Sequence, residues 1–334
     1  MNDMEKSRKL SVCGTFLYAL VRDGEEEKER SMKNTADDKS DRKLVLFFGI
    51  TLLWTWICGF IPVVFGFAGT GFGTFLFYFG GGAPSVTALF LVCFTYPKEA
   101  AKDYFHRCFS LKYMGWKWPL ITIGVFSVTT LLSLLIGVGV LGYEMPKMDF
   151  AQAILANPLM LFPVLLISLI SGPLNEEFGW RGYALDKLLV RFGVFKASAI
   201  LGFIWGIWHL AWYFTPGQAQ YQLLQDSVFH AVMFIPSTML LSFFVTFVYI
   251  KTKRSILAGA LVHMFSNLIG SQLLASYTTE ISAVIRYTNM FFFAIVIVYM
   301  CCSGKFREEA EEQIDRIKAD EKRFLAGAIP LKNI

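Results

Sequence analysis

The sequence predicts an all-α, polytopic membrane protein with about eight transmembrane helices. Three observations support this fold class. Of the 334 residues, 55% are hydrophobic and only 17% are charged, whereas a soluble domain carries about 25% charged residues. The mean hydropathy is +0.50. Apolar runs of about 20 residues, each long enough to cross a bilayer, recur along the chain.

These runs are continuously apolar and do not alternate between polar and apolar residues, as the strands of a membrane barrel would. Backbone groups in lipid must find their hydrogen-bond partners within the segment, so each run is expected to be a helix. In chain order the runs cover about residues 44–67, 73–95, 118–142, 158–180, 194–214, 230–250, 255–275 and 283–302.

The distribution of Lys and Arg predicts how the helices are oriented. With both termini on one side of the membrane, that side holds 29 of the 31 Lys and Arg residues, and the other side holds Lys147 and Arg286. Positive residues concentrate on the cytoplasmic side, so we expect both termini in the cytoplasm. The net charge of +5 reflects this bias and does not indicate a nucleic-acid partner.

Polar segments flank the membrane region. We expect a polar N-terminal cytoplasmic tail over residues 1–42, a transmembrane helical domain over 43–303 and a charged C-terminal cytoplasmic tail over 304–334. Within the last, residues 305–326 could form a surface helix, although a solvated tail is the default expectation. The six cysteines form no Cys-x-x-Cys pair and are expected to be inert, reduced thiols.

Three charged residues stand together at the end of the apolar run 158–173: Glu176, Glu177 and Arg181. Charges in or beside a membrane span cost about 2.5–3.5 kcal/mol each on insertion scales. Glu177 and Arg181 are four residues apart, so on a helix they share a face and can pair. Glu176 is rotated by about 100° and is available for another partner. The alternative is a charge cluster at the cytoplasmic end of a helix.

Two further spans carry histidines in apolar surroundings. His209 follows Trp205 by four residues, and His263 precedes Asn267 by four, so each pair lies on one helix face. Taken singly, His209 can be a packing residue, and the His263–Asn267 pair can be an interhelical hydrogen-bond staple.

The depth of these polar residues favours a shared site. If the fourth span continues to about residue 191, Glu176, His209 and Asn267 lie about 22, 20 and 18 Å from the cytoplasmic ends of their helices, at 1.5 Å per residue. His263 lies about 12 Å in by the same measure. Unrelated packing residues or interhelical hydrogen bonds would not need to lie at a similar depth, so we expect these polar groups to meet in one site.

Such a set is suited to hydrolysis of an amide bond. A carboxylate and an imidazole that converge on one water can deprotonate it, and a second imidazole with a carboxamide can donate to the developing oxyanion. No serine or cysteine stands where a nucleophile would be expected. Zinc is the less favoured alternative, with Glu176, His209 and His263 as its ligands. There is no His-Glu-x-x-His pair, and the positive Arg181 lies one turn from Glu177.

The chain resembles the CAAX protease and bacteriocin-processing family of intramembrane proteases, also called the Abi family, which includes the type II CAAX prenyl endopeptidases. The resemblance rests on three motifs in order: Glu-Glu-x-x-x-Arg at 176–181, an aromatic residue followed by x-x-x-His at 205–209, and His-x-x-x-Asn at 263–267. It covers about residues 155–275, which form the expected motif core.

The resemblance implies an eight-helix bundle with a catalytic cavity that faces the cytoplasm, and a metal-free glutamate mechanism with no cofactor. It implies that Glu176 and His209 activate the attacking water. It further implies that His263 and Asn267 form the oxyanion site, and that Glu177 and Arg181 support Glu176.

The resemblance leaves the substrate open. The second motif commonly opens with Phe, and Trp205 in its place points to bacterial members, so a bacterial cell membrane is expected in preference to the endoplasmic reticulum. We expect a membrane-associated protein or peptide, lipidated or not, as the substrate. The alternatives are a catalytically silent bacteriocin-immunity or membrane scaffold protein of the same fold, and a carrier that uses the Glu, His and Arg set as a proton relay.

Overall fold

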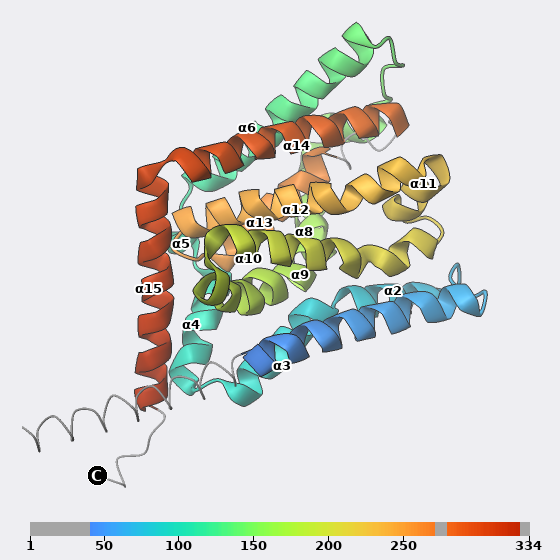
Figure 1. Ribbon diagram of the computed structural model, residues 1–334. Helices are drawn as coiled ribbons and strands as arrows, with labels where there is room; N and C mark the ends of the chain where they lie inside the picture. Colours follow the sequence, from blue (N-terminus) through green and yellow to red (C-terminus); the bar gives the residue numbers. More distant parts are fainter. Residues whose placement is uncertain (1–40, 271–278, 328–334) are drawn as a thin grey trace, which may run out of the picture. The chain divides into compact units, whose positions relative to one another are not determined.

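The structure is a computed structural model that describes residues 41–270 and 279–327 (Figure 1). The chain divides into two compact units, residues 1–46 and residues 47–334. Of the first unit, only residues 41–46 are described, and they are helical. The second unit is built of helices, and the described residues contain no β-strand. The all-α fold class is confirmed.

The first helix covers Asp41–Val64. The elements that follow are α2 (Gly71–Gly81), α3 (Ala83–Thr95), α4 (Lys98–Phe109), α5 (Leu111–Met114), α6 (Lys117–Leu134), the π-helix η1 (Leu135–Val140), α7 (Asp149–Ala156), the 3₁₀-helix η2 (Pro158–Met160), α8 (Leu161–Ile170), α9 (Pro173–Gly179), the π-helix η3 (Trp180–Leu185), α10 (Asp186–Trp208), the 3₁₀-helix η4 (His209–Phe214), α11 (Ala219–Asp226), α12 (Val228–Lys251), α13 (Ile256–Gly270), α14 (Thr279–Cys302) and α15 (Gly304–Gly327).

Several of these helices are long and apolar enough to cross a bilayer, so the chain is a multi-pass membrane protein. Within the described residues there are five such helices, or up to six if the bent pair α2 and α3 forms one span. The five are Asp41–Val64, Lys117–Val140, Pro158–Phe214, Val228–Lys251 and Glu280–Cys302. The expected number of eight is not confirmed.

Backbone breaks explain most of the difference. The expected run 73–95 is bent by 50° between α2 and α3. The expected runs 158–180 and 194–214 form one helical stretch of 57 residues. The apolar helix for the expected run 255–275 is only Ile256–Ile269, and residues 271–275 lie outside the described part of the chain.

The long stretch is interrupted at Gly193. This residue has φ +70° and ψ 174° within α10, a conformation that glycine adopts without the steric cost of a β-carbon. The segments on either side lie against each other, since the rings of Trp180 and Trp208 are 6.0 Å apart at their centroids. Gly193 therefore turns the chain into a helical hairpin, whose two arms are visible in Figure 1.

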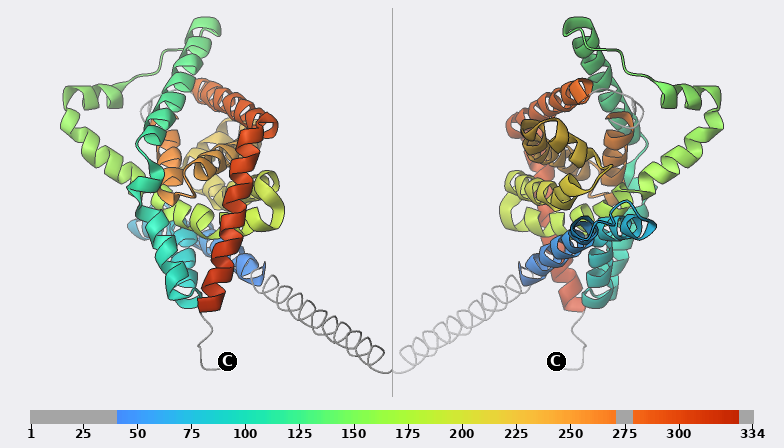
Figure 2. Two further views of the ribbon diagram at one scale, coloured as in Figure 1. Left: turned by 90° about the vertical axis from the view of Figure 1, so that its left-hand side faces the viewer. Right: turned by 90° about the vertical axis from the view of Figure 1, so that its right-hand side faces the viewer.

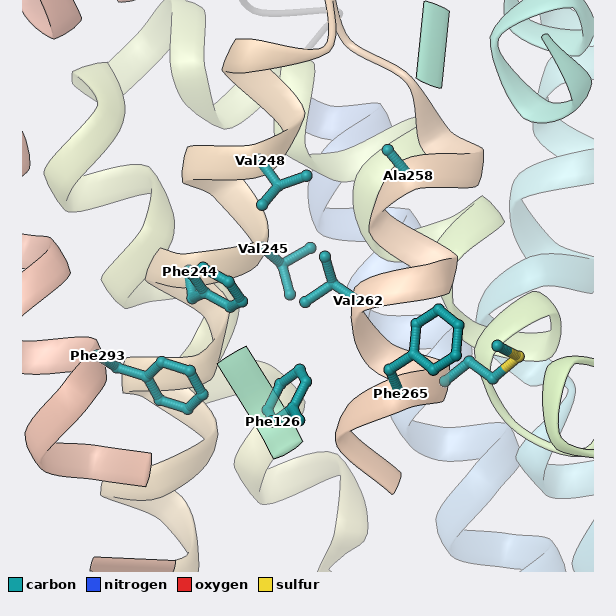
Figure 3. Close-up of a cluster of buried hydrophobic side chains, with 9 residues drawn as sticks. Phe126, Phe244, Val245, Val248, Ala258, Val262, Phe265 and Phe293 are labelled. Carbon is teal, nitrogen blue, oxygen red and sulfur yellow. The ribbon is translucent and has the colours of Figure 1, made fainter. Parts of the chain in front are cut away.

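A hydrophobic core joins α6, α12, α13 and α14 (Figure 3). The rings of Phe244 on α12 and Phe293 on α14 stack at 5.3 Å, and Phe126 on α6 meets both edge-on at 6.2 Å. Other large apolar side chains of the same helices point outward, such as Leu131 and Val298, which are 60% and 61% exposed. Outward apolar side chains on long helices are expected where the surrounding solvent is lipid.

A cluster of buried charges joins α4, α10 and the turn between α12 and α13. Asp186 Oδ2 lies 3.2 Å from Arg107 Nη1 and 3.1 Å from Arg254 Nη2, and Asp186 Oδ1 accepts a hydrogen bond from the Tyr249 hydroxyl at 2.7 Å. Burial alone would lower the pKa of the Arg107 guanidinium, but the neighbouring Tyr249 and Asp186 raise it well above its ordinary value. Both arginines therefore remain charged and compensate the buried carboxylate.

The C-terminal helix α15 packs beside α4, α10 and α12 (Figure 1, Figure 2). Its Asp320 lies 3.3 Å from Arg254 Nη1, and its Glu309 pairs with Lys251. Phe306 and Ile317 on the same helix are buried. Where a solvated tail was the default expectation, residues Gly304–Gly327 form a helix with one buried face.

Candidate active site

The helix α9, which carries the two glutamates, is held against α3 and α4. A β-carbon on Gly179 would lie 2.5 Å from the carbonyl oxygen of Pro84, so only glycine permits this close approach of α9 to α3. The Ser85 hydroxyl donates to the carbonyl of Leu174 at 2.7 Å, and the Tyr104 hydroxyl donates to the carbonyl of Phe178 at 2.8 Å. The π-helix η3 follows directly, and π-turns are frequent at functional sites.

Glu177 and Arg181 form the ion pair expected from their spacing. Arg181 Nη1 lies 2.7 Å from Glu177 Oε1, and both side chains are fully buried. His263 Nδ1 on α13 lies 3.0 Å from the same oxygen. The Arg181 guanidinium also lies 4.5 Å from the centroid of the Trp205 ring, in range for a cation–π contact. This burial contradicts the alternative of a solvated charge cluster at a helix end.

Glu176 has a hydrogen-bond partner different from that of Glu177. Trp205 Nε1 on α10 donates to Glu176 Oε2 at 2.6 Å, and Glu176 is only 7% exposed. This bond crosses the hairpin formed at Gly193. The second oxygen, Oε1, lies 3.7 Å from the position that a β-carbon on Gly172 would take. One oxygen of Glu176 is therefore held by the indole, and the other borders the backbone at Gly172.

His209 joins this group through Trp205. It lies at the end of α10, where η4 begins. Its Nδ1 is 2.8 Å from the carbonyl oxygen of Trp205, and because a carbonyl only accepts, Nδ1 carries the proton. Nε2 then has a lone pair available to accept a proton. The ring packs edge-on against Trp208 and Phe234, at centroid distances of 4.7 and 5.0 Å.

The third motif approaches from α13. The His263 ring meets the Trp205 ring at a centroid distance of 5.0 Å. Asn267, one turn further along, has its Nδ2 atom 4.0 Å from the β-carbon position of Gly172. All six predicted site residues thus belong to one region, in which Trp205 and Gly172 connect side chains from α9, the end of α10 and α13.

Glu176, His209 and His263, the ligands of the zinc alternative, are not arranged as a metal centre. Across residues 41–270 and 279–327, no group of three or more His, Cys, Asp or Glu side chains is arranged to hold a metal ion. Glu176 and His263 both contact the Trp205 side chain, and His209 is bound to the Trp205 backbone.

Sequence reasoning missed two parts of this region. It placed Trp205 on the face of His209 but did not predict that the indole holds Glu176, a contact between residues 29 positions apart. It also gave no role to Gly172. The signal for Trp205 was its donor N–H, since a buried indole usually finds an acceptor. No pattern in the sequence marks Gly172.

Comparison with known proteins finds two similarities. Residues 158–269 match the family model described as type II CAAX prenyl endopeptidase Rce1-like, and this range contains every predicted site residue. CAAX prenyl protease 2 of Methanococcus maripaludis is 27% identical over 260 residues, which are 74% of this chain and 95% of the relative. The resemblance to the type II CAAX prenyl endopeptidases is confirmed. The Rce1-like match and the relative both indicate a peptidase, here one with several membrane spans.

Proposed function

We propose that this protein is an intramembrane endopeptidase that hydrolyses a peptide bond of a membrane-associated or lipidated protein or peptide. The observation that supports it most is the position of Glu176. This buried carboxylate has one oxygen bound by Trp205 and the other beside Gly172, which the Asn267 amide also approaches. A carboxylate fixed in this way is suited to orient one water molecule for attack.

In the proposed reaction, Glu176 and His209 remove a proton from the water while its oxygen bonds to the carbonyl carbon. The electron pair of the carbonyl π-bond moves to the oxygen and forms an oxyanion. The carbon–nitrogen bond then breaks, and the proton taken from the water is delivered to the leaving nitrogen. The products are a new carboxyl terminus and a new amino terminus, with no covalent enzyme intermediate.

His263 and Asn267 are the proposed donors to the oxyanion. The amide of Asn267 borders the same space as Glu176 Oε1. His263 Nδ1 lies 3.0 Å from the Glu177 carboxylate, so its Nε2 is the nitrogen left for the oxyanion. One such donor contributes about 2.7–4 kcal/mol to transition-state stabilisation.

Glu177 and Arg181 support the site without touching the substrate. Their ion pair is fully buried, and the Trp205 ring that holds Glu176 lies over the guanidinium. The pair thus fixes the position of both Trp205 and His263. Because this support comes from residues of the chain itself, the proposed mechanism needs no cofactor, and zinc bound by Glu176, His209 and His263 is the competing arrangement.

The substrate and the cellular setting follow from the same proposal. The relative's name is CAAX prenyl protease 2, which favours a lipidated protein substrate that reaches the site from the membrane. We propose that both termini are cytoplasmic, as the Lys and Arg distribution predicts. The setting is a bacterial cell membrane in preference to the endoplasmic reticulum.

A comparison of new peptide termini tests the proposal. Cells that carry the wild-type protein are compared with cells that carry Glu176→Ala at equal expression, with His209→Ala as a second variant. Termini found only with the wild type are expected, and they identify substrates and cut sites. Identical termini in all three would favour the alternative of a silent immunity or scaffold protein. A carrier would show ion-dependent uptake in vesicles and no new termini.

A further inference from the structure

Gly172 occupies an unusual place at the junction between α8 and α9. It is partly exposed and is the residue immediately before the first turn of α9. Among the described residues, a β-carbon built on it would have two atoms within 4 Å, apart from its chain neighbours. These are Glu176 Oε1 at 3.7 Å and Asn267 Nδ2 at 4.0 Å.

Packing against the described residues does not require glycine at this position. At Gly179 a β-carbon would lie 2.5 Å from the backbone of Pro84, so the fold itself needs glycine there. At Gly172 the two nearest atoms are side-chain ends at ordinary van der Waals distances. Among the described residues, side-chain packing leaves room for a β-carbon at Gly172, and Glu176 and Asn267 border this room.

The two atoms that border this space have complementary chemistry. Glu176 Oε1 is the oxygen that Trp205 does not hold, since the indole binds Oε2. It is a hydrogen-bond acceptor suited to a water molecule. Asn267 Nδ2 is a donor suited to a carbonyl oxygen. A peptide bond under attack by water needs an acceptor on one side and a donor on the other.

We propose that Gly172 is the substrate-contact residue over which the scissile peptide bond lies. The absence of a side chain lets the substrate backbone approach. The carbonyl oxygen is directed to Asn267 Nδ2, and the attacking water sits between the carbonyl carbon and Glu176 Oε1. This assignment rests on the proposed function, because it places the substrate of that reaction.

If the scissile bond lies over Gly172, the free space at this residue controls the rate of cleavage. An added methyl group would touch the protein at ordinary distances and leave the fold unchanged, but it would occupy the volume of the water or the carbonyl group. Misplacement of reacting atoms by about 1 Å can cost about 100-fold in rate. We therefore expect a graded loss of kcat/KM of about 10-fold for Gly172→Ala and about 100-fold for Gly172→Val.

The experiment uses the full chain in membranes or detergent. The substrate is a quenched fluorescent peptide that spans a cut site found in the comparison of termini. Cleavage rate and thermal unfolding are measured for Gly172→Ala, Gly172→Val and Gly82→Ala. Gly82 is the matched control, because it also lies at a helix junction and its β-carbon would meet protein atoms only at 3.6–3.9 Å. Gly82→Ala should cleave at the wild-type rate.

Glu176→Ala separates failure of the assignment from failure of the proposed function. Loss of cleavage in Glu176→Ala together with the graded loss at Gly172, at unchanged thermal stability, supports the assignment. Loss in Glu176→Ala with a wild-type rate in Gly172→Val overturns the assignment alone. A wild-type rate in Glu176→Ala overturns the proposed function itself. A rate loss in Gly172→Ala matched by an equal loss of folded protein also overturns the assignment, because the fold would then require the glycine.

Discussion

The indole nitrogen of Trp205 lies 2.6 Å from Oε2 of Glu176 and connects two arms of one helical hairpin. The contact fixes which carboxylate oxygen is directed away from Trp205. A buried hydrogen bond to a charged group contributes about 1.5–3 kcal/mol.

The first prediction concerns this bond. Trp205→Phe keeps an aromatic ring over Arg181 but removes the N–H donor, so Glu176 loses its fixed orientation. We expect kcat to fall about 10- to 100-fold, the equivalent of that energy, with KM little changed. Trp208→Phe is the control, because it removes an indole bond to Thr55 at 2.7 Å and keeps the ring beside His209. Equal losses in both variants would contradict a specific role for Trp205.

The second prediction concerns the buried ion pair. Arg181→Ala leaves the Glu177 carboxylate fully buried without its guanidinium partner. Removal of one partner of a buried pair costs about 3–5 kcal/mol, so we expect a clear drop in the thermal unfolding temperature and loss of cleavage. Arg316→Ala is the control, since its pair with Glu312 is about half exposed on both sides and contributes at most about 1 kcal/mol. An unfolding temperature of Arg181→Ala equal to that of the wild type would show that the ion pair does not stabilise the folded protein.

The third prediction concerns metals. Because the proposed water activation uses Glu176 and His209 alone, cleavage should continue at a similar rate in EDTA or phenanthroline. The measurement is the cleavage rate before and after exhaustive chelation. Complete loss of activity that added zinc restores would instead favour the arrangement in which Glu176, His209 and His263 bind zinc.

The fourth prediction concerns the docking of α15. Arg254 contacts Asp186, Asp103 and Asp320, so Arg254→Ala removes the contact that links α15 to the buried cluster. We expect a loss of about 3–5 kcal/mol in the free energy of unfolding and faster proteolytic cleavage within residues 304–327. Asp320→Ala, whose side chain is 31% exposed, should accelerate proteolysis with little effect on global stability. Unchanged proteolysis in both would show that α15 is held by its apolar face.

The fifth prediction concerns Cys108 on α4. Burial raises the pKa of its thiol to about 12, from an ordinary value of 9.0. At pH 8 the folded protein should therefore resist iodoacetamide at Cys108, while the denatured chain should react there. The raised pKa has a second consequence. Since the thiol ionises more readily in the unfolded state, the free energy of unfolding should fall as the pH rises from about 9 towards 12. Rapid labelling of the folded protein would contradict the burial.

How much of the site the sequence predicts depends on how local each contact is. The Glu177–Arg181 pair follows from helix geometry, because four residues span about one turn. The contact of His263 with Glu177 joins residues 86 positions apart. Equal depth in the membrane indicated convergence, but only the packed structure shows which carboxylate meets the histidine and which meets the tryptophan.

For the membrane spans, too, local features were predictable from the sequence and long-range packing was not. Apolar composition predicted that the chain is helical and crosses the membrane several times. Gly80, Gly81 and Gly82 interrupt the expected run 73–95, and such a glycine run is compatible with a kink, with close helix packing or with a site. The bend between α2 and α3 was therefore one open alternative. The charged cluster around Asp186 was missed. Arg107 and Arg254 were assigned to cytoplasmic loops, and their burial depends on contacts with α10 that no local pattern records.

The turn at Gly193 also bears on the order in which the site is assembled during synthesis. Glu176, Arg181 and Trp205 all lie within one hairpin, so they can meet before α13 has left the ribosome, since helical units form as the chain is made. The nascent hairpin then carries Glu177 and Arg181 as a compensated ion pair. His263 and Asn267 arrive later and complete the region. A chain halted before α13 would hold the bound carboxylate without the groups that face it across Gly172.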